Sequence, residues 1–192
     1  MKRHMIKLLV IAAIMFAATS AFADYSYNFD VNTSSISGQT GYLELQFNPG
    51  LNPGVASAVI SNFTSDAALG ASILTGDVTG ALPGAVTINN TTGWNDYFQA
   101  LTFGNGAHFT LNLAGSADNS FGLSFYGADG VTSLLTSDPS GFATTIDMNA
   151  NGAAINSNSS QVTVAATPIP AAAWLFGSGV MGLAGIRRRM TV

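Results

Sequence analysis

The chain has 192 residues, no cysteine and a formal net charge of −4. Its six Lys and Arg residues lie near the two ends, while all ten Asp and Glu residues lie between Asp24 and Asp147. A central region without Lys or Arg excludes nucleic-acid binding, because phosphate contacts need cations. The lack of cysteine excludes disulfides, thiolate metal sites and cysteine nucleophiles.

The N-terminus has the layout of a secretory signal peptide. Lys2, Arg3 and Lys7 surround the start of an apolar run over residues 8–18, and Ala21 and Ala23 supply small residues at the −3 and −1 positions. This order of basic, apolar and small residues predicts a signal peptide over residues 1–23, cut by signal peptidase before Asp24. An uncleaved helix is less favoured, because the run is short for a bilayer that needs about 20 apolar residues.

Between the two ends, apolar and polar residues alternate with a period of two, which is typical of half-buried strands. The stretches that show it are 25–31, 43–47, 55–63, 107–113, 121–126 and 142–148, with a further strand expected at 161–164. In the third stretch Val55, Val59 and Phe63 share one parity. Many short strands separated by turns predict an all-β fold for residues 24–164, an antiparallel β-sandwich of jelly-roll type.

Turn residues punctuate these strands. Asn105-Gly106 and Asp129-Gly130 each predict a two-residue hairpin, because both dipeptides tolerate positive φ. Residues 94–101 are the one stretch that suggests a short helix, with Thr92 as its cap. Residues 151–160 are small and polar, as in a linker or a hairpin loop.

No catalytic constellation and no cofactor site is evident, so we expect a protein that is not an enzyme. His108 lies on the polar parity of its strand, where exposure is expected. Asp147, Asn149 and Asn151 match the first positions of a calcium loop, but a turn at Asn151-Gly152 is the favoured interpretation. Trp94, Tyr97 and Phe98 would either stack on sugar rings or pack one helix face onto the sheet.

The C-terminal residues 165–192 form a separate segment. Pro168 and Pro170 precede an uncharged run over about 171–186, and Arg187, Arg188 and Arg189 follow it. The run predicts a transmembrane helix of marginal length, and the arginines predict a cytoplasmic C-terminus. One interpretation is a plain membrane anchor.

The order and identity of these residues closely resemble the PEP-CTERM sorting signal. The matching positions are Pro168, Pro170, Ala171, Ala172, Trp174, Gly177, Gly179, Gly182, Arg187, Arg188 and Arg189, whereas Ile169 stands where the motif has Glu. The resemblance implies that exosortase, a membrane-embedded transpeptidase or protease, cuts the chain near the proline motif. It also implies an inner-membrane intermediate that is then released to the cell surface or the extracellular space.

Segments of the central region also resemble an uncharacterised PEP-CTERM family of Gram-negative bacteria. They are 31–35, 41–43, 46–50, 95–99 and 138–142. Because exosortase systems accompany exopolysaccharide loci, the resemblance implies a non-enzymatic surface or matrix protein associated with exopolysaccharide and biofilm. A carbohydrate-binding β-sandwich module, with or without calcium, is the alternative, and a jelly-roll hydrolase ranks last.

Overall fold

The computed structural model describes residues 25–115 and 118–167. Twelve strands and one 3-10 helix make up this part of the chain. The elements are β1 (Tyr25–Asn32), η1 (Ser34–Ile36), β2 (Thr40–Pro49), β3 (Ala56–Ser65), β4 (Ala68–Thr75), β5 (Val78–Gly80), β6 (Val86–Asn89), β7 (Asp96–Thr102), β8 (Gly106–Gly115), β9 (Asn119–Gly127), β10 (Phe142–Asn149), β11 (Gly152–Ser157) and β12 (Val162–Thr167).

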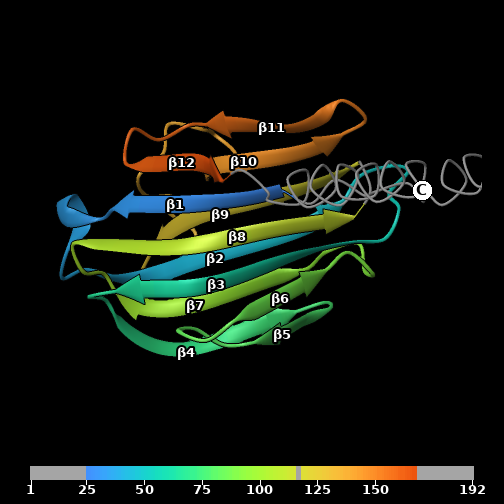
Figure 1. The fold of residues 1–192 in the computed structure, drawn as a ribbon. Coiled ribbons are helices and arrows are strands. Elements are labelled where there is room, and N and C mark those ends of the chain that lie inside the picture. The colour runs from blue at the N-terminus through green and yellow to red at the C-terminus, as the bar shows by residue number, and fades with distance from the viewer. Residues whose placement is uncertain (1–24, 116–117, 168–192) are drawn as a thin grey trace, which may run out of the picture.

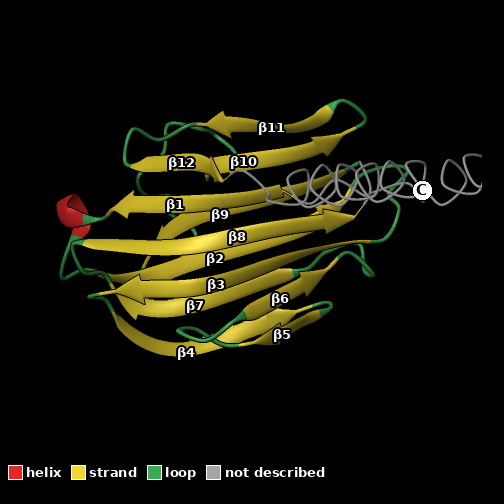
Figure 2. Ribbon diagram, in the orientation of Figure 1, coloured by secondary structure: helices red, strands yellow, loops and turns green. Residues whose placement is uncertain are grey.

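The strands form two six-stranded sheets. Sheet A has the order β12-β1-β8-β3-β6-β5 and sheet B the order β11-β10-β9-β2-β7-β4, with every described pairing antiparallel. Figure 1 shows the strands running side by side from β11 and β12 at the top to β4 and β5 at the bottom. Most of the described chain is strand, joined by loops and one short helix (Figure 2). The predicted antiparallel β-sandwich is confirmed.

The core lies between the inner faces of the two sheets, as the alternation predicts. Phe29 on β1 stacks on Phe109 of β8 with ring centroids 4.6 Å apart, and it meets Phe121 of β9 in sheet B edge-on at 5.9 Å. Ile60 and Leu45 are fully buried in the same cluster. Burial of these large side chains from both sheets is the main term that stabilises a sandwich without disulfides.

The predicted helix over residues 94–101 is wrong. Asp96–Thr102 is strand β7, which pairs with β2 on one side and β4 on the other. Tyr97 points into the core, whereas Phe98 lies on the opposite face and Trp94 is exposed before the strand. The three aromatic residues therefore share neither a helix face nor a common stacking surface. Tertiary pairing has overridden a weak local preference.

The Asn105-Gly106 hairpin is also wrong. β7 belongs to sheet B and β8 to sheet A, so this turn carries the chain from one sheet to the other. The Asp66 carboxylate holds it, because it accepts hydrogen bonds from the Asn105 N–H and side-chain amide at 2.7 Å and from the Gly106 N–H at 3.2 Å. The second predicted turn, Asp129-Gly130, does form, but only a single bridge from Tyr126 to Ser133 follows it.

Two further expectations fail for local reasons. In β3 the buried residues include Ala58 and Ile60, not Val55 or Val59, and a register shift near Asn62, whose φ is 54°, turns Phe63 inward. Residues 151–160 contain edge strand β11 rather than a loop alone. β12, in contrast, confirms the expected last strand and extends to Thr167.

The described residues contain no helix that is long and apolar enough to cross a membrane. The predicted signal peptide, its cleavage site at Ala21, Ala23 and Asp24, and the C-terminal sorting segment from Pro168 onward lie outside the described residues.

Candidate functional site

The outer face of sheet B carries the largest group of buried polar side chains away from the core. On β2 the inward residues are Leu43, Leu45 and Phe47, so the residues between them point outward. Glu44 and Gln46 are outward-facing and yet only 7% and 5% exposed. Outward-facing strand residues are normally solvated, so their burial marks this face as unusual.

Glu44 has neighbours on both adjacent strands. It lies directly opposite Ser124 of β9 and Phe98 of β7, while Asp96 of β7 lies opposite Gln46. Glu44 and Asp96 are thus diagonal neighbours on one face, a relation that long side chains can bridge. The Glu44 Oε2 accepts a hydrogen bond from the Tyr126 hydroxyl at 3.2 Å.

Two buried oxygens of this group have no hydrogen-bond partner among the described residues. They are Oδ1 of Asp96, which is 8% exposed, and Oγ of Ser124, which is 0% exposed. An unpartnered buried polar atom costs about 1–3 kcal/mol. Such atoms in a native fold indicate a functional role, such as binding a ligand or an ion.

Burial and like charge set the electrostatics of the pair. Burial, and after it the charge of the neighbouring Glu44 carboxylate, raise the pKa of Asp96 to about 7. Burial also raises the pKa of Glu44 above its usual value, while hydrogen bonds from Gln46 and Tyr126 oppose that rise. Residues 25–167 contain no Lys or Arg, so no basic side chain of this region neutralises the two carboxyl groups.

Aromatic rings flank the carboxylates. Tyr42 of β2 stacks on Phe98 with ring centroids 4.4 Å apart, and Phe98 lies 6.0 Å from the ring of Tyr126. All three rings are half-buried. The loop after β9 passes over two of them, because a Cβ on Gly130 would lie 3.7 Å from the Tyr42 ring and 3.9 Å from the Phe98 ring. We call Tyr42, Phe98 and Tyr126 the aromatic cluster.

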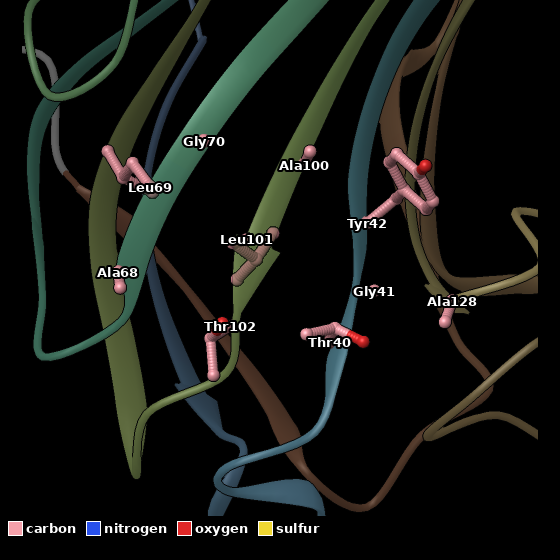
Figure 3. A pocket seen from close by; sticks show the side chains of 10 residues that line it. All are labelled: Thr40, Gly41, Tyr42, Ala68, Leu69, Gly70, Ala100, Leu101, Thr102 and Ala128. Carbon is pink, nitrogen blue, oxygen red and sulfur yellow. The ribbon is translucent and has the colours of Figure 1, made fainter.

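Beside the aromatic cluster the outer face of sheet B is hollowed. The hollow has a volume of about 310 Å³. Figure 3 shows small side chains from β4 and β7, among them Ala68 and Ala100, on one side of it, and Tyr42 of β2 with Ala128 of the following loop on the other. Thr40 and Thr102 add hydroxyl groups at one end. A floor of small residues beside an aromatic ring leaves room for a sugar ring, whose apolar face can pack on the aromatic ring.

A second hollow of about 510 Å³ lies elsewhere, between the segment around Thr136 and the loop from Asn158 to Gln161. Hydroxyl and amide side chains dominate its lining, which includes no aromatic ring and no charged residue. It therefore offers fewer kinds of contact than the hollow beside Tyr42.

The turn that the sequence favoured over a calcium loop is present, and it joins β10 to β11. Asp147 lies on β10, where its carboxylate accepts hydrogen bonds from the Ser120 hydroxyl at 2.6 Å and the Asn156 amide at 2.8 Å. Asn149 Oδ1 accepts the N–H of Asn151 at 2.9 Å and closes the β10–β11 turn. The oxygens of Asp147 and Asn149 are therefore engaged in holding the hairpin together.

The predicted exposure of His108 is confirmed: its side chain is 64% exposed on sheet A, paired with Asp30. Sequence reasoning missed the Glu44 and Asp96 pair, although one signal was present. Glu44 is the sole glutamate of the chain, and it lies at a polar position of an alternating strand. Because the sequence predicts a helix over residues 94–101, it gives no sign that Asp96 lies near Glu44.

Fold and site together define an antiparallel β-sandwich whose outer sheet-B face carries a buried acidic pair beside a shallow hollow. Comparison of the chain with protein-family models, curated proteins and solved structures finds no match.

Proposed function

We propose that this chain is an exported, non-enzymatic surface or extracellular-matrix protein that exosortase sorts and that associates with exopolysaccharide in the biofilm. The sorting part of the proposal rests on the PEP-CTERM resemblance of Pro168, Pro170, Trp174 and the arginines from Arg187 onward. Signal peptidase and exosortase are its processing enzymes. The inner membrane holds the intermediate through residues 171–186 before release to the surface or the extracellular space.

The observation that carries the polysaccharide part is the hollow beside Tyr42. Sugar-binding sites combine a ring that stacks on the apolar face of a sugar with hydroxyl and amide groups around it. Tyr42 supplies such a ring, and Thr40 and Thr102 supply hydroxyls at the same opening. In this view the sandwich is a carbohydrate-binding module as well as a matrix protein.

A glycosidase is the rival, because it too needs two carboxyl groups, one with a raised pKa. Glu44 and Asp96 meet that electrostatic requirement, but they are 7% and 8% exposed. A scissile bond has to reach both carboxyl groups, and side chains this buried do not line an open cleft. We therefore favour binding over hydrolysis.

Glycan binding by the full chain in detergent tests the proposal. Tyr42→Ala should weaken binding to the best polysaccharide by about ten-fold, as expected for removal of a central aromatic contact. Trp94→Ala is the matched control, because Trp94 is an aromatic residue that is 52% exposed and does not line the hollow. Equal loss in both variants, or no binding to any polysaccharide, contradicts the proposal. Release of reducing ends that Asp96→Asn abolishes would establish the hydrolase instead.

A further inference from the structure

The acidic pair on the outer face of sheet B has no protein counter-ion, and this calls for a partner from outside the chain. Residues 25–167 contain no Lys or Arg, and their one histidine, His108, is paired with Asp30 on sheet A. Two buried carboxyl groups side by side can be neutralised by a shared proton or by a bound cation. A shared proton would leave Ser124 Oγ with only its contact to the Tyr126 hydroxyl, which does not have the geometry of a full hydrogen bond.

Three side chains of this group present oxygen atoms suited to a hard cation, while the Gln46 amide and the Tyr126 hydroxyl donate hydrogen bonds to Glu44. Glu44 and Asp96 contribute carboxylates, and Ser124 lies directly opposite Glu44 on the same face with a fully buried and unpartnered Oγ. Asp96 Oδ1 is also unpartnered, and Asp96 is 92% buried, since 8% of it is exposed. No nitrogen or sulfur ligand of the kind that zinc prefers is part of the group.

We propose that Glu44, Asp96 and Ser124 form a calcium site on the outer face of sheet B. The two carboxylates balance the charge of Ca²⁺ in full, and water completes the six to eight oxygens that this ion takes. Calcium suits the site better than Mg²⁺, because the ligands come from three strands and need not meet an ideal octahedron. Among the described residues no third Asp, Glu, His or Cys joins the two carboxylates. A site with two charged ligands binds Ca²⁺ with moderate affinity, because affinity rises with the number of charged ligands.

With this donor set we expect a dissociation constant in the range of extracellular calcium modules, about 0.1–1 mM. The site adjoins the Tyr42 hollow, because Phe98, which lies opposite Glu44, stacks on Tyr42. The ion would hold β2, β7 and β9 together under the glycan-binding face. Calcium binding is measured without a glycan, so it can fail or succeed independently of the proposed function.

The test uses the full chain in detergent, stripped of metal with a chelator that is then removed. Addition of 10 mM Ca²⁺ at constant ionic strength should raise the melting temperature by about 3–10 °C, with a smaller rise for Mg²⁺. Asp96→Asn and Glu44→Gln keep the side-chain shapes and should each abolish the calcium-dependent rise, while Ser124→Ala should weaken binding several-fold. Asp30→Asn is the matched control, because Asp30 is an exposed strand carboxylate on the outer face of sheet A.

A second readout locates the ion even if one variant fails to fold. Tb³⁺, which replaces Ca²⁺ at oxygen sites, is excited by a nearby tyrosine, and Tyr126 lies 3.2 Å from Glu44 Oε2. Tyr126→Phe should therefore reduce sensitised Tb³⁺ emission by more than half, and Ca²⁺ should displace the probe from the wild-type protein. The site is overturned if Ca²⁺ does not raise the melting temperature of the wild type. It is also overturned if Asp30→Asn loses as much of that rise as Asp96→Asn, or if Tyr126→Phe leaves the Tb³⁺ emission unchanged.

Discussion

Removal of the Tyr97 hydroxyl tests how a buried polar network holds sheet B together. Tyr97 is fully buried on the inner face of β7, and its hydroxyl donates to Gln99 Oε1 at 2.8 Å and accepts the Leu82 N–H at 3.0 Å. Gln99 in turn donates to the Gly70 carbonyl at 2.9 Å in the bulged edge strand β4. One hydroxyl therefore links β7 to the loop before β6 and, through Gln99, to the sheet edge.

The Tyr97→Phe substitution keeps the ring and leaves two buried groups without their partner. The Leu82 N–H and Gln99 Oε1 lie in residues that are 8% and 2% exposed, so water does not replace the lost bonds. Each unsatisfied group costs about 1–3 kcal/mol, so the two together lower the free energy of unfolding by about 2–6 kcal/mol. For a chain of this size the melting temperature should fall by about 4–24 °C.

Thermal and urea unfolding, followed by far-UV circular dichroism, measure this loss, with the urea m-value unchanged. Tyr42→Phe is the control, because no hydrogen bond to the Tyr42 hydroxyl is found among the described residues, and its stability should change by less than about 0.5 kcal/mol. A double-mutant cycle with Gln99→Leu should show a coupling of about 0.5–3 kcal/mol. The reasoning is refuted if Tyr97→Phe unfolds within about 0.5 kcal/mol of the wild type, or no lower than Tyr42→Phe.

Four further outcomes are expected. Phe29→Ala, which empties a core position that is 1% exposed, should cost about 3–5 kcal/mol, and a two-state urea curve close to wild type would contradict it. Hydrogen bonds from Asn105 and Gly106 lower the pKa of Asp66, so its stabilisation is present above pH 4 and is lost as the pH falls through the folded-state pKa. Asp66→Asn should therefore have a lower free energy of unfolding than the wild type at pH 6, and this difference should shrink in acid. A difference that does not change with pH would mean that only a neutral contact is lost. N-terminal sequencing of the exported protein should find Asp24 first, and retention of the leader would rule out the predicted cleavage. Changing Pro168 and Pro170 to Ala should keep membrane insertion but block exosortase processing, so normal release of this variant would reduce the tail to a plain anchor.

Some properties of this protein are determined by its sequence alone. The period-two alternation around Phe29, Leu45 and Phe109 requires half-buried strands, because successive side chains of a strand point to opposite faces. The lack of Cys, Lys and Arg in the central region settles that the fold stands without disulfides or Lys/Arg ion pairs there. These are local or compositional properties, and the structure agrees with them.

Tertiary structure alone decided which strands are neighbours and where each strand shifts register. Residues around Asp96 have a weak local preference, and they form strand β7 because they pair with β2 on one side and β4 on the other. The shift near Asn62 and the one after Phe142 exchange inner and outer residues, which alternation cannot foresee. The approach of Glu44 to Asp96, 52 positions apart in the sequence, depends on the order of strands in sheet B. Alternation along a strand shows only which residues share a face, whereas the order of strands decides which residues of distant segments meet. For this reason the acidic pair is visible in the fold and not in the sequence.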